Sequence, residues 1–326
     1  MKAIYDVIVA QAFGDAFAMP SEQMTREQIK RCFGSITSLR DGHPENIVTG
    51  DLKRAEVTDD TILSLLLAKQ MIDHKGRLDA AIYIQYIEEW MRSHPTRENI
   101  IGPSTKKAVS NFLNGMELED LGLMGETNGA AMRILPIGIV YDFRKKNFLE
   151  MVYEASRSTH NTTIAVSCAA AVATCISYGV RGGRDIHEMI EEAKNNAKAS
   201  RVYGRDLGYA KFEERLDILF ELLECRDSLE EKLRLIHEGF GTSYQSIDSV
   251  TAALAIVKLT DADVSEAVEI AANLGGDTDT IASMAAGICA SLRGIESIDP
   301  KDISAIEQAN EIDFSYYERE LSVYVE

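Results

Sequence analysis

Residues 275–280 read Gly-Gly-Asp-Thr-Asp-Thr, and an apolar helical pattern follows them from Asp279 to Leu292. This pattern predicts that the segment opens a helix. The two glycines permit unusual backbone angles and a close approach of other groups, so we expect the carboxylates of Asp277 and Asp279 to point toward one locus. Oxygen ligands of this kind suit Mg²⁺, Mn²⁺ or Ca²⁺ better than Zn²⁺. The stretch therefore predicts a helix that begins at a cation site.

A second acidic motif, Thr58-Asp59-Asp60-Thr61, lies far away in the sequence and also precedes a helical pattern, Thr61 to Ile72. Taken alone, it is equally typical of a helix N-cap with acidic residues in the first turn. If the two motifs meet, they bring four carboxylates into one pocket. Such a pocket needs cations to stay ionised, because like charges in a confined site raise each other's pKa. A dinuclear metal centre is therefore the first hypothesis to test.

The remaining pattern predicts an all-α fold. Helical periodicity dominates, and no alternating apolar stretch is long enough for a central sheet; Val323–Val325 is the one candidate extended segment. We expect a single domain over residues 1–326, because a boundary between the two motifs would separate their carboxylates. The first helix is expected to end near Gly14-Asp15, with long loops at Phe33–Val57 and Gly204–Gly208. Further helices are expected at 79–91, 105–113, 148–156, 162–178, 186–199, 212–223, 229–237, 249–259, 264–272 and 302–311.

Composition narrows the class of partner and compartment. The net charge of −18 disfavours nucleic acid and anionic membranes as partners, because an acidic surface repels phosphates. The apolar stretch Ile164 to Ile176 looks too short to span a bilayer, and Asp6 and Asp15 interrupt the N-terminus in a way that a signal peptide does not. The five cysteines are an odd number without CxxC spacing. Free thiols in a reducing cytoplasm are therefore expected.

Three further segments carry polar or small residues in unusual settings. Gly14–Glu22 places Asp15 within apolar sequence, where a buried carboxylate must be paired or must cap a helix. Asn128–Gly138 contains small residues that suit backbone approach to a ligand; the plainer interpretation is a turn followed by a packed helix that Pro136 ends. Thr159-His160 stands at a helix start, where a lone histidine is more often structural than catalytic.

Taken together and in this order, the five segments resemble the ADP-ribosylglycohydrolase family, which includes the dinitrogenase-reductase-activating glycohydrolases and the ADP-ribosyl-acceptor hydrolases. The resemblance runs from Gly14 to about Gly287 and rests on the patterns Gly-Asp-Ala-x-x-Met-Pro-x-Glu, Thr-Asp-Asp-Thr, Asn-Gly-Ala-x-Met-Arg-Ile-x-Pro-Ile and Gly-Gly-Asp-Thr-Asp-Thr-Ile-Ala. It implies a single compact domain of mostly orthogonal helices. Ala18 stands where the family often has glycine, a small change that we expect to leave activity intact.

The resemblance also implies the roles of individual residues. The implied ligands of two Mg²⁺ or Mn²⁺ ions are Thr58, Asp59, Asp60, Asp277, Asp279 and Thr280. Glu22 matches a family glutamate on a loop beside the metals. The wall that holds the distal part of the substrate is matched by Asn128, Gly129, Ala130 and Met132, and His160 matches a histidine near the ligand.

The implied chemistry is hydrolysis at the anomeric carbon of an ADP-ribosyl group, on an ADP-ribosylated amino acid, an O-acyl-ADP-ribose or an ADP-ribosylated protein. Two divalent ions can chelate a cis 2′,3′-diol and acidify a water molecule, and nearby carboxylates stabilise an oxocarbenium-like state. Glu22, Asp59, Asp60 and Asp277 are the expected catalytic residues, with Glu22 in the acid/base role.

The region around Glu126 departs from the family's serine-ADP-ribose hydrolases. Its charge would lie near a substrate diphosphate, and repulsion there costs on the order of 1 kcal/mol. The first alternative substrate is therefore a smaller N-riboside or ribosyl monophosphate, unless Glu126 points to solvent.

Three other protein classes fit less well. An isoprenoid synthase needs an acid at position 63, which is Leu63. A phosphatase of the DxD type places its aspartates after a strand, and none precedes Asp277. A non-catalytic, ADP-ribose-binding or crystallin-like family member would be expected to lack metal ligands, whereas all six are present here.

Overall fold

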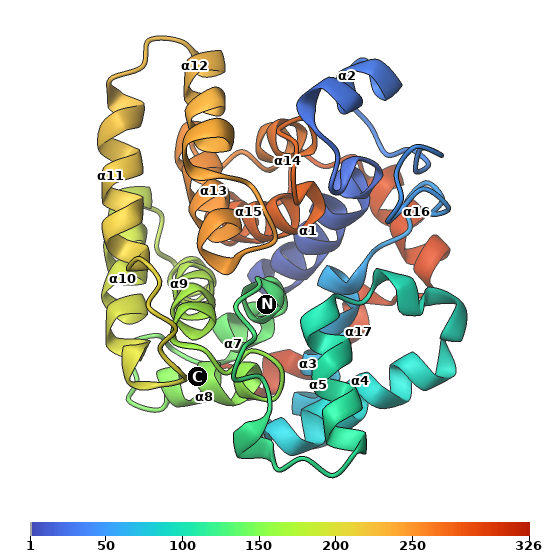
Figure 1. The fold of residues 1–326 in the computed structure, drawn as a ribbon, viewed down its shortest axis with the longest axis vertical. Coiled ribbons are helices and arrows are strands. Elements are labelled where there is room, and N and C mark those ends of the chain that lie inside the picture. The colour runs from blue at the N-terminus through green and yellow to red at the C-terminus, as the bar shows by residue number, and fades with distance from the viewer. Residues whose placement is uncertain (1) are drawn as a thin grey trace.

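Two helices at the centre of the molecule carry most of the predicted site. The computed structural model describes residues 2–326. In it α1 (Lys2–Ala18) packs along α15 (Thr278–Arg293), and Figure 1 shows both in the middle of the fold. A Cβ atom at Gly14 would lie 2.4 Å from the carbonyl oxygen of Ala282. The absence of a side chain at Gly14 therefore lets the two backbones approach, which places Asp15 one residue from the contact.

Helices crossing at large angles surround this pair. Figure 1 shows α9 (Thr163–Val180) almost end-on, whereas α11 (Phe212–Glu224) runs along the length of the view. The other α-helices of residues 2–326 are α2 (Arg26–Phe33), α3 (Asp59–Asp73), α4 (Ala80–Ser93), α5 (Pro103–Leu113), α6 (Gly129–Met132), α7 (Leu135–Val140), α8 (Phe148–Arg157), α10 (Ile186–Ala199), α12 (Leu229–Arg234), α13 (Ser246–Leu259), α14 (Val264–Ala272), α16 (Pro300–Asn310) and α17 (Phe314–Leu321). Within the same residues, β-pairing is limited to three isolated bridges. The predicted all-α, mostly orthogonal fold is confirmed.

The apolar segment in the middle of the chain is a core helix. The helix that contains Ile164–Ile176 is longer than that stretch: α9 has 18 residues and is long and apolar enough, by length and composition only, to cross a membrane. However, 89% of it is buried inside the protein. Helices α6, α7, α8, α10 and α15 pack against α9, so other helices bury its apolar surface.

Several predicted boundaries were wrong, each for a local reason. Helix α1 continues through Gly14-Asp15, because Asp15 accepts hydrogen bonds from another segment and does not end its own helix. Helix α2, which Thr25 opens with a capping box, was not predicted; it ends at Phe33, where the predicted loop Phe33–Val57 begins, and residues 34–57 form no helix. Pro136 stands in the first turn of α7 and does not end a helix. Val323–Val325 overlaps a 3₁₀ turn, Ser322–Tyr324.

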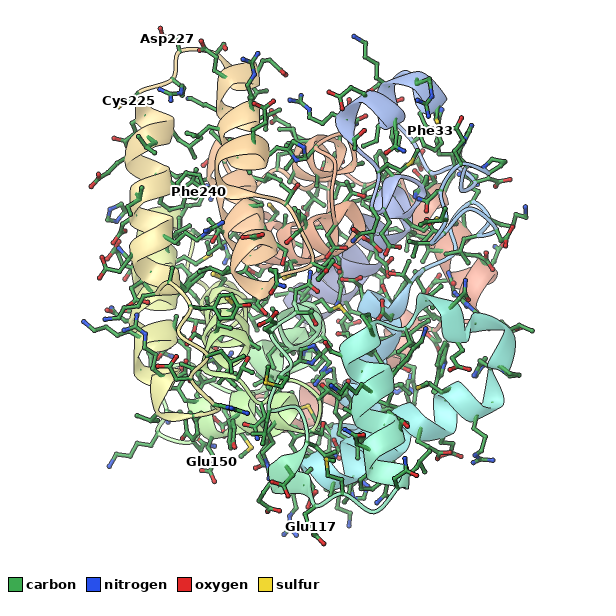
Figure 2. All side chains as sticks on the ribbon, viewed as in Figure 1. Phe33, Glu117, Glu150, Cys225, Asp227 and Phe240 are labelled. Carbon is green, nitrogen blue, oxygen red and sulfur yellow. The ribbon has the colours of Figure 1, made fainter. Side chains whose placement is uncertain are left out.

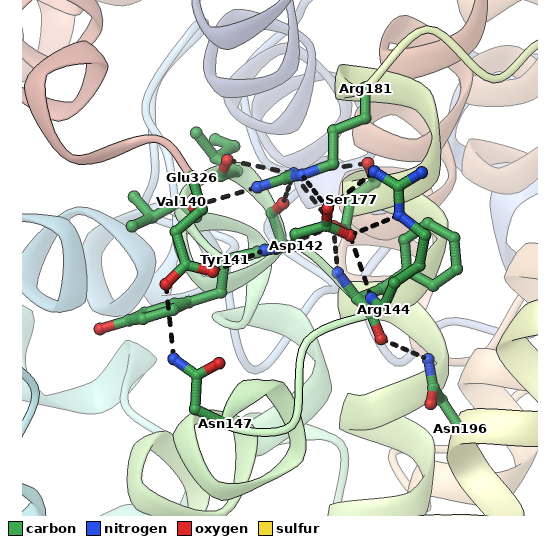
Figure 3. Close-up of polar contacts among 12 residues, drawn as sticks. Val140, Tyr141, Asp142, Arg144, Asn147, Ser177, Arg181, Asn196 and Glu326 are labelled. Atoms are coloured by element: carbon green, nitrogen blue, oxygen red, sulfur yellow. Dashed lines mark hydrogen bonds and ion pairs between the residues drawn. The ribbon is translucent and has the colours of Figure 1, made fainter.

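The carboxyl end of α7 is held by a polar cluster around Arg181 (Figure 3). Arg181 donates to the carbonyl oxygens of Gly138 (3.1 Å) and Val140 (3.0 Å), which a helix end leaves without intrahelical partners. Glu326 donates its backbone N–H to the oxygen of Val140 (3.0 Å). Because α7 directly follows the Asn128–Met132 segment, this cluster anchors the wall of the site from behind.

The cysteines among the described residues form no disulfide. Cys168, Cys175 and Cys289 are buried, and burial raises the pKa of each thiol. Cys225 is exposed where α11 ends, at the edge of the molecule in Figure 2. The prediction of free thiols is confirmed for these residues.

Candidate functional site

The N-termini of α3 and α15 face each other inside the fold. Thr58 is the N-cap of α3, and Asp277 is the N-cap of α15. The hydroxyl oxygen of Thr58 lies 3.3 Å from Oδ2 of Asp279, and that of Thr280 lies 3.2 Å from Oδ2 of Asp60. The prediction that the two acidic motifs meet is therefore confirmed, although they are more than 200 positions apart.

The hydroxyl of Thr58 has one proton and three carboxylate neighbours. The nearest acceptor is Asp15 at 2.8 Å, whereas Asp60 and Asp279 lie at 3.2 and 3.3 Å. Asp15 also accepts from the backbone N–H groups of Thr58 (3.0 Å) and Thr61 (3.1 Å). When Thr58 donates its proton to Asp15, its lone pairs face Asp60 and Asp279. The hydroxyl oxygen of Thr58, Oδ2 of Asp60 and Oδ2 of Asp279 then face one another without a proton between them. A cation would stabilise this arrangement.

Two carboxylate oxygens in this cluster have no hydrogen-bond partner. Oδ1 of Asp60 and Oδ1 of Asp279 are buried and unpaired, which is costly for a charged group in the absence of a ligand. Potential ligand atoms of Asp15, Asp60 and Asp279 lie within 4.8 Å of one another, and so do those of Glu22, Asp277 and Asp279. The donor set is all oxygen and Asp279 is common to both groups. These residues fit hard divalent cations.

A turn of two glycines sets the direction of Asp277. Gly276 has φ of +83° and a Cβ atom there would lie 2.2 Å from the oxygen of Thr242, so only glycine fits. The backbone N–H of Asp277 donates to that same oxygen at 2.7 Å. Its side chain accepts from the amides of Gln23 (3.2 Å, on Oδ1) and Asn128 (on Oδ2). Both donors are neutral, so they orient the carboxylate without competing as cations for a metal.

A cavity of about 360 Å³ opens above the two motifs. Burial, followed by repulsion from neighbouring carboxylates, holds the pKa of Glu22, Asp60 and Asp279 well above the usual range. Burial is also the main reason that the pKa of Asp59 rises to about 7. The cavity is therefore a place where either protons or cations must balance the acidic side chains.

The structure places most of the sequence-predicted residues around this cavity. Those that line it are Glu22, Asp59, Asn128, Gly129, Met132, His160, Asp277, Asp279 and Thr280. Thr58 and Asp60 are buried beneath it, linked to the lining residues by the contacts above. Ala130 is fully buried outside the lining, and Glu126 is also outside it, because Tyr209 and Gln245 donate to its carboxylate. The individual roles assigned to these residues remain predictions.

Other residues of the site carried no clear signal in the sequence. The segment Ile100–Thr105 forms one wall, and Gly102 donates its N–H to Oδ2 of Asp59 at 2.9 Å. Gln23 has φ of +57°, and its backbone N–H donates to the oxygen of Gly276 at 2.8 Å. Gly102-Pro103 is a recognisable helix start, but nothing in the sequence places it beside Asp59.

A second group of possible metal ligands lies at the end of α2 and on the loop that follows it. Cys32, His43 and Glu45 have ligand atoms within 4.8 Å of one another. Arg31 already forms an ion pair with Glu45. Because a cationic side chain occupies this group, we assign no metal to it.

Comparison with known proteins agrees with the geometry. The sequence model of the family described as ADP-ribosylglycohydrolase matches residues 2–320. The Escherichia coli (strain K12) protein YegU, whose description states no activity, is 33% identical over 99% of this chain and 97% of its own length. The ADP-ribosyl-[dinitrogen reductase] glycohydrolase of Rhodospirillum rubrum is 24% identical over 91% of this chain and 87% of its own. The ADP-ribosylarginine hydrolase Tri1 of Pseudomonas putida (strain GB-1) is 23% identical over 94% and 74%, respectively.

A solved structure described as an ADP-ribosylglycohydrolase-related protein complex superimposes with a TM-score of 0.69 at 19% identity. The superposition covers 99% of this chain and 97% of that chain, which shows the fold. Together with the family match over nearly the whole sequence, it identifies the chain as a hydrolase that belongs to the ADP-ribosylglycohydrolase family.

Proposed function

We propose that this chain, as one domain over residues 1–326, hydrolyses the bond at the anomeric carbon of an ADP-ribosyl group with the help of two Mg²⁺ or Mn²⁺ ions. The observation that supports this most is the pair of unpartnered buried oxygens on Asp60 and Asp279, beside the unprotonated face of Thr58. Relatives named for ADP-ribosylated dinitrogen reductase and ADP-ribosylarginine favour an amino-acid-linked substrate, on a protein or free.

The residues that would hold the two ions are Thr58, Asp59, Asp60, Asp277, Asp279 and Thr280. When bound, the ions would supply charge to fix a ribose diol and to acidify water. Asp15 would keep the Thr58 hydroxyl oriented with its lone pairs toward them. Gln23 and Asn128 would hold Asp277 in place.

Glu22 is suited to move a proton at the leaving group. It lies at the cavity, and its ligand atoms are close to those of Asp277 and Asp279. Burial and the neighbouring carboxylates hold the pKa of Glu22 well above its usual range, which favours its protonated form in the metal-free site. A protonated carboxyl can give its proton to a departing amine or alcohol and then accept one from water. Ile100, Ile101 and Met132 line the same cavity and would exclude bulk water.

The distal part of the substrate would lie along Asn128, Gly129 and His160. Gly129 leaves room for the His160 ring, since a Cβ atom would lie 2.6 Å from Cε1 of His160. Ala130 would support this wall from the core. Glu126 would reach a substrate only after leaving Tyr209 and Gln245. A reducing cytoplasm fits the free thiols.

A second candidate, a smaller N-riboside or ribosyl monophosphate, is favoured by one observation. Among the described residues, no lysine or arginine lines the cavity, whereas Glu22, Asp59, Asp277 and Asp279 do. A diphosphate would therefore find no protein cation there. A neutral riboside would avoid that electrostatic cost.

A hydrolysis panel tests the proposal. Purified protein with Mg²⁺ or Mn²⁺ would be assayed on ADP-ribosyl-arginine, ADP-ribosyl-serine, O-acetyl-ADP-ribose and simple ribosides. Release of ADP-ribose supports the leading proposal if the variant Asp279→Asn loses this activity and the exposed control Asp227→Asn keeps it. Release of ribose or ribose phosphate alone supports the second candidate. Calorimetric binding of ADP-ribose without any turnover would leave a non-catalytic family member.

A further inference from the structure

A line of polar side chains leads from a buried arginine to the cavity. Arg133 is fully buried, and the described part of the chain gives it no carboxylate in ion-pair contact. Its guanidinium packs over the ring of Tyr83, 5.0 Å from the ring centroid. Nη2 donates to the oxygen of Ala155 (2.8 Å) and to the hydroxyl of Thr159 (2.7 Å). A guanidinium can only donate, so the direction of the first hydrogen bond is fixed.

The next hydrogen bond determines which ring nitrogen of His160 carries the proton. The hydroxyl of Thr159 accepts from Arg133 and lies 2.7 Å from Nδ1 of His160. If Nδ1 carried a proton, the Thr159 proton would be buried without an acceptor, which is unfavourable. Thr159 therefore donates to Nδ1. Burial and the nearby charge of Arg133 hold the pKa of His160 well below its ordinary value, in agreement with a neutral ring protonated on Nε2.

The order of donor and acceptor continues through the hydroxyls of Thr127 and Ser104. Nε2 of His160 donates to Oγ1 of Thr127 at 2.8 Å. The proton of Thr127 in turn points to Oγ of Ser104, 3.1 Å away. Ser104 thus accepts, and its own proton has no acceptor within residues 2–326. Ser104 lines the main cavity and also a neighbouring cavity of about 300 Å³.

We infer that Ser104 presents its hydroxyl proton to the substrate and selects a group that can only accept a hydrogen bond. The chemistry recognised is an acceptor oxygen, which a phosphoryl group or the carbonyl of a base can supply. Arg133, Thr159, His160 and Thr127 act as positioning residues, because each fixes the proton of the next. This inference rests on the proposed function for the identity of the ligand, but the hydrogen-bond order does not depend on it.

The binding test uses two probes that separate the sources of the oxygen. ADP-ribose carries phosphoryl oxygens, and inosine carries a base carbonyl without phosphate. Affinity would be measured by calorimetry with Mg²⁺ for the parent chain and for Ser104→Ala and Ser104→Thr. We expect Ser104→Ala to weaken one probe about tenfold, as the loss of a hydrogen bond to a charged acceptor does, or about threefold for a neutral carbonyl. Ser104→Thr keeps the hydroxyl and restores binding.

The control is Ser110→Ala, an exposed serine on the same helix, α5, which leaves both affinities unchanged. A Ser104→Ala chain that binds each probe as tightly as the parent overturns the inference. In an active enzyme, the loss in Ser104→Ala falls on KM with kcat unchanged when Ser104 binds the ground state and the transition state equally. A loss of folded protein would affect Ser104→Thr as well.

The ligand-free test reads the proton positions directly. In the ¹⁵N spectrum of histidine-labelled protein, the signals absent from His160→Gln should show Nε2 protonated and Nδ1 bare, with no change across neutral pH. Thr159→Val should remove that preference while exposed His187 serves as the internal reference. A proton on Nδ1 in the parent chain contradicts the hydrogen-bond order. If neither probe binds the parent chain while the tautomer is as stated, the proposed function fails and the hydrogen-bond order stands.

Discussion

Replacing one carboxylate of the cavity should stabilise the metal-free protein. Folding raises the pKa of Asp59 from 3.8 to about 7, chiefly through burial. The native state therefore holds this proton more tightly than the unfolded chain. The stability linked to Asp59 is complete below its unfolded pKa, and it is lost as the pH rises through the native pKa. Ionising Asp59 at pH 8 costs about 4 kcal/mol, which the uncharged variant Asp59→Asn avoids.

For a chain of 326 residues, that free energy corresponds to a rise in Tm of about 6 °C. Asn can still accept from the N–H of Gly102, so the local hydrogen bond of Asp59 survives. At pH 5 the unfolded group is largely ionised and the native one is not, so the gain shrinks to less than half, about 2 kcal/mol.

The assay is calorimetric or fluorescence melting in EDTA at pH 5 and pH 8, then with MgCl₂ at pH 8. In EDTA the variant should melt above the parent, most at pH 8. With MgCl₂ the parent should gain stability and the variant should gain less, because it has lost a ligand. The exposed control Asp227→Asn should follow the parent. An Asp59→Asn protein that melts below the parent in EDTA at pH 8 would refute the electrostatic reasoning.

Three further predictions test other parts of the site and fold. Gln23→Met removes the donor to Oδ1 of Asp277 and should weaken the binding of divalent cations, measured by calorimetry, about tenfold. The control Gln308→Met, at an exposed glutamine on α16, should leave the affinity unchanged. Equal affinities in the two variants would show that the Gln23 amide does not orient Asp277. Gly276→Ala should destabilise the chain by at least about 2 kcal/mol in urea unfolding, because a Cβ atom meets the oxygen of Thr242; a near-neutral effect would contradict the tight turn. Hydrogen bonds from Arg144 lower the pKa of Asp142 to about 2. The ionised group therefore adds about 2 kcal/mol of stability above pH 4, which is lost as the pH falls toward 2. In urea unfolding, Asp142→Asn should be less stable than the parent at pH 7 and equal to it near pH 2, and a difference in stability that does not change with pH would exclude this linkage.

The sequence was sufficient for the features that depend on local pattern. Helical periodicity predicted the existence of most helices, because amphipathic burial repeats every 3.6 residues. The two acidic motifs stood out because carboxylates in adjacent or alternating positions repel one another unless a proton or a cation lies between them. Their meeting is a tertiary fact that the sequence alone supported as a hypothesis and the family resemblance implied; the structure shows it. The prediction for Asp15 held because a carboxylate in apolar sequence must find donors, and Thr58 and Thr61 supply them.

What the sequence could not predict depends on contacts between distant segments. Gln23 bonds to Asp277 because a left-handed residue turns its chain toward Gly276, and no composition signal marks it. Ser104 gains importance only through Thr127 and His160, which come from other elements. Glu126 is the reverse case, a residue that the sequence placed near the substrate and that lies outside the cavity lining. From the sequence, its carboxylate could lie either near a substrate diphosphate or in solvent. In the structure it accepts hydrogen bonds from Tyr209 and Gln245, outside the cavity lining.

The central claim is that the acidic cavity holds two divalent cations, and counting bound Mn²⁺ per chain tests it most directly. Titration of metal-free protein with Mn²⁺, followed by electron paramagnetic resonance of the free ion, gives the stoichiometry without any substrate. We predict two ions per parent chain and weakened binding of both in Asp279→Asn, because Asp279 belongs to both ligand groups. A parent chain that binds no Mn²⁺ more tightly than Asp279→Asn would contradict the account.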